Sequence, residues 1–178
     1  MKNNKKTFVL WLTGLSASGK TTLASATAQE LKNLGYDVHH LDGDEVRANL
    51  PVDLGFTKEG RDKNIEMAID LAKKYQNQGK IVIASFITPY KEHRKWGRER
   101  LNNYIEVFAD CPLHVCEKRD PKKLYQKARK GEVKNFTGID DPYEEPEKAD
   151  INVKTHQYTL DESREIIIEY LKENSLIL

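Results

Sequence analysis

The stretch from Thr13 to Ala24, TGLSASGKTTLA, follows an apolar run and opens a segment with helical spacing. Residues 14–21 fit the pattern G-x-x-x-x-G-K-[ST], in which glycine lets the backbone approach phosphate oxygens and consecutive N–H groups bind the anion. The first turn of the following helix adds partial positive charge. A strand, this loop and a helix in succession predict a phosphate-binding P-loop.

The residues of the P-loop have separate roles toward a nucleoside triphosphate. We expect the Lys20 ammonium at the β and γ phosphates and the Thr21 hydroxyl at a Mg²⁺ ion, so ATP with Mg²⁺ is the predicted donor complex. The nucleotide-binding residues that we expect are Gly14, Leu15, Ser16, Ala17, Ser18, Gly19, Lys20, Thr21 and Thr22.

The rest of the chain alternates short β-branched and aromatic runs with segments of helical spacing. The runs are TFVLWLTG (7–14), YDVHHLDG (36–43), KIVIASFI (80–87), YIEVFAD (104–110) and DINVKT (150–155). Such alternation is typical of a parallel sheet. We therefore expect an α/β fold, a three-layer α/β/α sandwich with a mainly parallel sheet, in a single domain over residues 1–178. Gly35 and Gly79 should end the first two long helices, and Thr159 should cap the last.

One long segment, residues 128–148, interrupts this alternation. Its sequence, ARKGEVKNFTGIDDPYEEPEK, combines two glycines, two prolines and many charges with few apolar residues. Long loops in compact domains are usually functional or disordered. Phe136 and Ile139 favour a mobile lid that docks on a bound ligand, and a passive solvated insertion is the alternative.

Composition and cysteine spacing exclude several classes of function. The 29 Lys and Arg residues balance 28 Asp and Glu residues, so nucleic acid is not an expected partner. No apolar stretch approaches the roughly 18 residues of a membrane span, and the charged opening leads into the P-loop without a cleavage site, so we expect a soluble protein. Cys111 and Cys116 around His114, and the adjacent His39 and His40, suit structural roles better than a metal site.

An acidic motif follows the second predicted strand. In Asp42-Gly43-Asp44 a carboxylate would lie near the P-loop if the sheet is parallel, where it can orient an acceptor hydroxyl and help to hold the metal. A turn with a helix cap is the alternative interpretation. No N-K-x-D signature is present, and the run KIVIASF ends in Ser85 and Phe86 without the Asp-Glu of many ATPases. These features disfavour a GTP switch or a motor.

Cations and one amide follow the predicted strand ends, although most such surface groups are simply solvated. They are Arg47, Arg61, Asn64, Lys91, Arg94, Lys122 and Lys123. If they hold an anionic acceptor, the residues alone predict a P-loop kinase for a small, anionic hydroxyl compound. A kinase for a sugar acid or a nucleoside, and a nucleotide-dependent regulatory module, remain alternatives.

Longer stretches extend this prediction, because most of the chain resembles the adenylylsulfate kinase (APS kinase) family, which has the P-loop nucleoside-triphosphate hydrolase fold. The resemblance covers about Thr7 to Thr155, and its most specific stretches are GFTKEGRDKNI, RDPKKLYQKAR and FTGIDDPYEEP. It implies phosphorylation of the 3'-hydroxyl of adenosine 5'-phosphosulfate by MgATP, giving 3'-phosphoadenosine 5'-phosphosulfate and ADP in sulfate assimilation. It also implies a cytoplasmic, stand-alone enzyme that forms a homodimer.

The resemblance assigns roles to individual residues. Asp44 is implied to orient or deprotonate the acceptor hydroxyl and to join Thr21 at the magnesium. Lys20 and Lys122 are implied to act on the transferring phosphoryl group, and Phe56 and Phe136 to enclose the acceptor's adenine. The implied substrate-binding residues are Asp42, Asp44, Arg47, Phe56, Arg61, Asn64, Ile87, Thr88, Lys122 and Phe136.

Three positions depart from the family's pattern. Ala17 replaces a frequent glycine, which we expect to matter little, and Glu66 with Met67 replaces a common arginine pair. Thr88 stands where members often have a serine that has been proposed as a phosphorylated intermediate. We favour direct in-line transfer, because phosphoryl transfer needs positioning and charge balance and no covalent relay.

Overall fold

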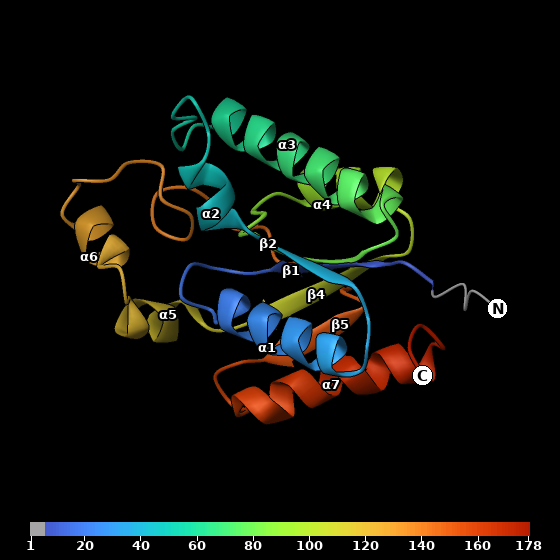
Figure 1. The fold of residues 1–178 in the computed structure, drawn as a ribbon. Coiled ribbons are helices and arrows are strands. Elements are labelled where there is room, and N and C mark those ends of the chain that lie inside the picture. The colour runs from blue at the N-terminus through green and yellow to red at the C-terminus, as the bar shows by residue number, and fades with distance from the viewer. Residues whose placement is uncertain (1–5) are drawn as a thin grey trace.

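The computed structural model describes residues 6–178, and its ribbon is shown in Figure 1. Residues 1–5, which belong to the predicted domain and to the charged opening considered above, lie outside the described residues. Five parallel strands form one sheet in the order β2-β3-β1-β4-β5. The strands are β1 (Val9–Thr13), β2 (Val38–Asp42), β3 (Ile81–Ser85), β4 (Tyr104–Asp110) and β5 (Ile151–Lys154). The α/β prediction and all five predicted runs are confirmed.

Helices cover both faces of the sheet, which gives the predicted three layers (Figure 1). On one face lie α1 (Lys20–Asn33) and α7 (Leu160–Glu173), and on the other α3 (Lys58–Asn77) and α4 (Lys91–Arg100). Three short helices lie beyond the carboxyl ends of the strands: α2 (Gly43–Ala48), α5 (Leu113–Arg119) and α6 (Leu124–Arg129). Neither α4 nor the short helices were predicted from the sequence, except that the alternative interpretation of Asp42-Gly43-Asp44 included a helix cap at the start of α2.

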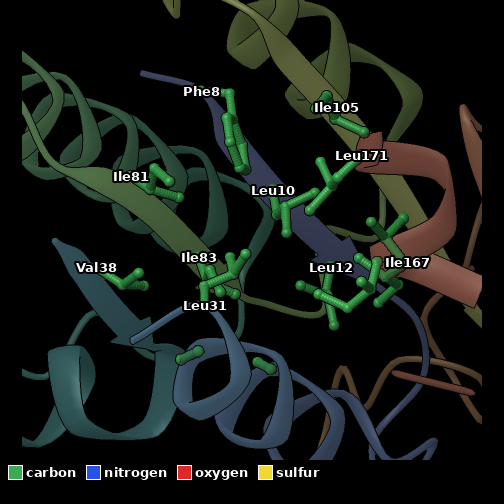
Figure 2. Packing of buried hydrophobic residues seen from close by; sticks show 14 of the residues in the cluster. Phe8, Leu10, Leu12, Leu31, Val38, Ile81, Ile83, Ile105, Ile167 and Leu171 are labelled. Atoms are coloured by element: carbon green, nitrogen blue, oxygen red, sulfur yellow. The ribbon is translucent and has the colours of Figure 1, made fainter. Parts of the chain in front are cut away.

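The apolar core lies on both sides of β1, because successive side chains of a strand point to opposite faces. Leu10 and Leu12 belong to the cluster that includes Leu31 of α1 and Ile167 of α7 (Figure 2). Trp11 lies in the cluster on the α3 side of the sheet. All of these side chains are buried, and each leucine and isoleucine contributes about 1.5 to 3 kcal/mol through burial of apolar surface.

The predicted helix boundaries are confirmed. The helices α1 and α3 end shortly before Gly35 and Gly79. Thr159 caps α7 in a reciprocal capping box with Glu162, so two backbone N–H groups at the helix start are satisfied. No helix in the described part of the chain is both long enough and apolar enough to cross a membrane.

The residues that were weighed as metal ligands have structural contacts. His39 stacks on Tyr75 with ring centroids 3.6 Å apart, and His40 Nε2 lies 3.1 Å from Ser85 Oγ. Cys111 and Cys116 are buried free thiols. The structural interpretation of both pairs is therefore supported.

The segment 128–148 is docked on the rest of the molecule. It begins in the last two residues of α6, and within it the structure shows a single isolated bridge, between Thr137 and Asp141. Phe136 is only 5% exposed and packs edge-on against Tyr125 at a centroid distance of 5.0 Å. Ile139 lies against the same cluster, so the segment has more apolar contacts than we expected. Its mobility remains a prediction.

Candidate active site

The P-loop conformation depends on two glycines between β1 and α1. Gly14 has φ +151°, and a Cβ at this position would lie 2.8 Å from both Ala109 O and Ser18 Oγ. Gly19 has φ +92°, a left-handed conformation that side chains disfavour. Ala17 also has a positive φ of 61°, so the alanine that we expected to matter little is in a strained conformation.

Lys20 is buried at the start of α1. Its Nζ donates to Leu15 O at 2.6 Å and to Ser18 Oγ at 3.4 Å, which holds the ammonium inside the loop. Burial removes the charge from water and lowers the pKa of Lys20 to about 8. A phosphate beside it would favour the charged form, so anion binding relieves an unfavourable burial.

Asp42 is the hydrogen-bonding centre beside the P-loop. Thr21 Oγ1 and Ser85 Oγ donate to its Oδ2 at 2.7 and 3.1 Å. Its Oδ1 accepts the N–H groups of Asp44 and Glu45 and so caps α2, as the alternative interpretation of this motif expected. Although burial alone would raise the pKa of Asp42, these hydrogen bonds hold it below its usual value, and the carboxylate stays ionised.

A cavity of about 660 Å³ lies beyond the carboxyl ends of β1, β2 and β3, where ligands bind in open parallel sheets. It includes P-loop residues and every residue expected to bind the acceptor. The predicted residues that line it are Ser16, Ala17, Gly19, Lys20, Thr21, Thr22, Asp42, Asp44, Arg47, Phe56, Arg61, Asn64, Ile87, Thr88, Lys122 and Phe136. Gly14, Leu15 and Ser18 are not among its lining residues, and Leu15 and Ser18 are buried.

Asp44 and Lys122 face each other across this cavity. Lys122 Nζ forms an ion pair with Asp44 Oδ2, and the two side chains remain 55% and 71% exposed, respectively. Asp44 therefore points into the open cavity and not into the core. The pair places one carboxylate and one ammonium between the P-loop and the far wall.

Phe56 and Phe136 line the cavity from two segments that one arginine connects. Arg61 Nε donates to Phe56 O at 3.0 Å, and its Nη2 donates to Asn135 O at 2.5 Å. Phe56 is 40% exposed, whereas Phe136 is buried. Arg61 thus joins the start of α3 to the segment 128–148 in addition to lining the cavity.

Arg47 and Asn64 provide further polar groups on this wall. The Arg47 guanidinium lies over the Phe56 ring, 4.7 Å from its centroid, and donates to Gly55 O at 3.0 Å. Asn64 Oδ1 is buried and has no hydrogen-bond partner among the described residues. An orphaned buried acceptor that lines a cavity is a group that a ligand donor can satisfy.

The loop after β3 is hydrogen-bonded to the end of β1 and to the first residue of the P-loop. Ile87 O accepts Gly14 N at 3.3 Å and Thr13 Oγ1 at 2.7 Å. Thr88 has φ 49°, an outlier for a β-branched residue, and its Oγ1 accepts Trp11 Nε1 at 2.8 Å. The carbonyl of Ile87 and the hydroxyl of Thr88 are therefore engaged within the protein.

Three of the expected cations do not line the cavity. Arg94 is buried, with Nη1 donating to Thr88 O and Nη2 to Glu144 O, at 3.0 and 2.6 Å. Lys91 pairs with Glu147 on the surface. Lys123 precedes α6 with φ 55°. The structure assigns these three to scaffold or surface.

One wall of the cavity was not predicted from the sequence. Arg119, Asp120, Pro121 and Leu124 line it. Arg119 donates to Ala17 O at 3.3 Å and to Thr155 O at 3.0 Å, which ties α5 to the P-loop. The signal was the stretch RDPKKLY, from which Lys122 and Lys123 were singled out and these four neighbours were not.

The oxygen atoms beside the P-loop suit a magnesium ion. Thr21 supplies a hydroxyl, and Asp42 and Asp44 supply carboxylates in the same cavity. No group of three or more His, Cys, Asp or Glu side chains within residues 6–178 is arranged to hold a metal. Few protein ligands are typical of Mg²⁺, which keeps waters and binds substrate phosphates.

Comparison with known proteins identifies the family. The family model for adenylylsulphate kinase matches residues 6–154. The adenylyl-sulfate kinase of Clostridium acetobutylicum is 49% identical over 174 residues, which are 97% of this chain and 87% of that protein. That of Halothermothrix orenii is also 49% identical, over 98% of this chain and 94% of the relative.

Solved structures agree. The structure of Mycobacterium tuberculosis APS kinase in complex with AMPPNP and APS has a TM-score of 0.89 at 37% identity, covering 94% of this chain and 98% of that one. A gluconokinase from Sinorhizobium meliloti, at 17% identity, shares the fold alone. The chain therefore belongs to the adenylylsulfate kinase family, and it is an ATP-dependent phosphotransferase with adenylylsulfate kinase activity.

Proposed function

We propose that this protein transfers the γ-phosphoryl group of MgATP to the 3'-hydroxyl of adenosine 5'-phosphosulfate, giving 3'-phosphoadenosine 5'-phosphosulfate and ADP. One observation carries the proposal: a single cavity is lined by the P-loop and by two phenylalanines with arginines beside them. The acceptor's purine needs apolar faces, its phosphosulfate needs cations, and its ribose hydroxyl needs a nearby carboxylate. The Mycobacterium tuberculosis relative, in complex with AMPPNP and APS, supports the same pairing of ligands.

The donor side of the site binds the triphosphate. Backbone N–H groups of residues 14–22 and the start of α1 would hold its phosphates, and Lys20 would place a full charge on the transferring group. Thr21 would hold the magnesium, with Asp44 as a second ligand. Asp42 accepts a hydrogen bond from the Thr21 hydroxyl, and this bond would leave the oxygen lone pairs of Thr21 available to the cation. The ion supplies charge balance for the phosphate oxygens when bound.

On the acceptor side, Asp44 would receive the proton of the 3'-hydroxyl or fix its orientation. The hydroxyl oxygen forms a bond to the γ-phosphorus as the bond to the bridging oxygen of ADP breaks. Lys122 forms an ion pair with Asp44. When the acceptor binds beside Asp44, Lys122 would move to the negative charge that develops on the transferring phosphoryl group. Positioning and charge balance then account for the reaction.

The remaining groups would bind the acceptor itself. Phe56 and Phe136 would enclose the adenine, and Arg47 and Arg61 would bind the phosphosulfate, for which the guanidinium fork is suited. Asn64 Oδ1 would accept a hydrogen bond from the acceptor. Ile87 and Thr88 would form the base of the pocket.

Direct transfer to the acceptor is favoured over a phosphorylated Thr88. The Thr88 hydroxyl accepts Trp11 Nε1, donates to Phe86 O at 3.3 Å and is buried. A nucleophile needs its oxygen lone pair free and a base to take its proton. Thr88→Val should therefore leave turnover within about tenfold of wild type, because the loop loses a hydrogen bond and no covalent step.

A coupled assay of ADP release tests the proposed reaction. ATP and magnesium are supplied with adenosine 5'-phosphosulfate, and gluconate, shikimate or adenosine serve as control acceptors. ADP should form with the first acceptor alone, and Asp44→Asn should lower turnover by about 10²- to 10⁴-fold. Equal ADP release without any acceptor would favour a regulatory nucleotide hydrolase instead.

Three properties of the whole chain are also proposals. We infer a homodimer, a cytoplasmic location and a single domain with a mobile lid at 128–148, on the family resemblance and the loop composition. Light scattering after gel filtration should give twice the mass of one chain. Hydrogen exchange in the lid should slow when both nucleotides are added, and unchanged exchange would argue against closure.

A further inference from the structure

Arg61 carries a buried charge that meets one carboxylate. Its side chain is 7% exposed, and the lone acidic group within ion-pair distance among residues 6–178 is Asp141, with Nε to Oδ2 at 3.6 Å. Burial lowers the pKa of Arg61, and Asp141 is the largest effect that opposes this. A buried guanidinium without such a partner is costly. Asp141 therefore stabilises Arg61 where it stands.

Asp141 itself is held by a tyrosine from another element. Tyr90 precedes α4, and its hydroxyl donates to both carboxylate oxygens of Asp141, at 2.9 and 3.2 Å. Burial and this hydrogen bond raise the pKa of Tyr90, so it remains a donor over the physiological range. Arg61, Asp141 and Tyr90 form one cluster that joins α3, the segment 128–148 and the start of α4.

The cluster controls the two segments that carry the phenylalanines. Arg61 donates to the carbonyl of Phe56 and to that of Asn135, the residue before Phe136. Asp141 lies at the other end of the same turn, where its N–H donates to Phe136 O at 3.2 Å. A shift of Arg61 or Asp141 would therefore change the spacing between the rings. None of these contacts involves the P-loop.

We propose that Asp141 and Tyr90 are positioning residues for acceptor recognition, which hold Arg61 in place and so set the spacing of Phe56 and Phe136. The inference rests on the proposed function, since it assumes that these rings enclose the acceptor's purine. Loss of Asp141 or Tyr90 should therefore weaken the binding of the acceptor and leave the binding of ATP nearly unchanged.

Steady-state kinetics of the full chain separates this role from a general structural one. Wild type, Asp141→Asn and Tyr90→Phe are compared with varied adenosine 5'-phosphosulfate at saturating MgATP, and the reverse. We expect Asp141→Asn to raise the acceptor KM about tenfold and Tyr90→Phe about threefold, with the KM for ATP within about twofold in both. Because Tyr90 acts through the carboxylate of Asp141, the rise in acceptor KM of the double variant should be smaller than the product of the two single rises.

Glu147→Gln is the matched control. Glu147 lies on the segment 128–148 but outside the cavity, and the substitution removes its ion pair with Lys91 of α4. It should leave both KM values unchanged. Equal rises in both KM values, or an Asp141→Asn variant that behaves like the control, would overturn the inference. If Asp141→Asn does not fold, the KM values of Tyr90→Phe and Glu147→Gln are compared instead, and a Tyr90→Phe variant that behaves like Glu147→Gln would overturn the inference. If the wild-type protein is inactive toward adenosine 5'-phosphosulfate, both proposals are overturned. If the wild-type protein is active and the variants have its acceptor KM, this inference alone is overturned.

Discussion

The donor and acceptor sides of the cavity are built in different ways. The donor side is one continuous stretch, residues 14–22, whose shape comes from the backbone and from bonds such as Lys20 to Leu15 O. The acceptor side is assembled from distant segments: 74 residues separate Arg61 from Asn135, and 78 separate Asp44 from Lys122. Variants on the two sides should therefore affect the two substrates separately.

The largest expected effect is on the donor side, from Lys20→Met. We expect kcat/KM to fall by at least about 10³-fold, because the loop loses its full positive charge. Folding should survive, since the lowered pKa of Lys20 shows that its charge is buried unfavourably, and methionine is similar in shape. ADP release and thermal unfolding measure the two effects. A variant that keeps more than about a tenth of the activity would contradict this assignment.

The acceptor side predicts a selective effect of Phe136→Ala. Loss of stacking on a base costs about 1 to 3 kcal/mol, or roughly 5- to 150-fold in acceptor affinity. ATP affinity should change little. Calorimetric titration of each ligand provides the measurement, and Phe136→Leu is the control, because it keeps the apolar contact with Tyr125 and loses the flat ring. An equal loss of ATP affinity would mean that the two sides are not separable.

The difference between the two sides also explains what the sequence could predict. The P-loop and the Asp42-Gly43-Asp44 motif were found because their chemistry is local, and the parallel sheet brings strand ends together whatever their loops do. The five strands and the ends of α1, α3 and α7 were visible in periodicity and in capping residues. Within residues 14–22, the strain at Ala17 and the bond from Arg119 to the carbonyl of Ala17 were not predicted.

The contacts of the acceptor side were not predictable in the same way. Nothing near Arg61 in the sequence indicates that it bonds to Asn135 O, and nothing near Thr88 indicates a bond from Trp11 across 77 residues. Arg94 resembles any surface cation until the fold buries it against Glu144 O. Such pairings depend on tertiary packing, which a single sequence does not encode as a local pattern.

The pH dependence of ATP binding provides a test restricted to the donor side. In the free protein Lys20 loses its proton as pH rises through about 8, whereas bound phosphates favour its charged form. ATP binding must then take up a proton, so its affinity should be flat below pH 8 and fall by up to about tenfold per pH unit above it. Calorimetry in buffers of different ionisation enthalpy would detect the uptake at pH 9. Constant affinity up to pH 10 would contradict the shifted pKa.

The same shift has a consequence for stability, with the opposite direction. Between pH 8 and the ordinary lysine pKa of 10.5, the unfolded chain binds a proton at Lys20 that the folded protein does not. The free energy of unfolding should therefore contain a contribution from Lys20 that rises with pH in this window and is at its minimum below pH 8. Lys20→Met should abolish this contribution, which the difference between the two urea unfolding profiles would show.

The smallest effect concerns the backbone of the donor side, at Ala17. Its φ of 61° costs an alanine about 1 kcal/mol relative to glycine, but glycine gains entropy in the unfolded chain, so Ala17→Gly should change the free energy of unfolding by less than about 1 kcal/mol. A β-branched residue tolerates this conformation poorly, and Ala17→Val should destabilise the protein by roughly 1 to 3 kcal/mol. Urea unfolding with a constant m-value compares the pair. Neither change removes the bond from Arg119 to the carbonyl of residue 17. A lower free energy of unfolding in the valine variant alone would therefore come from the backbone of the loop and not from a side-chain contact.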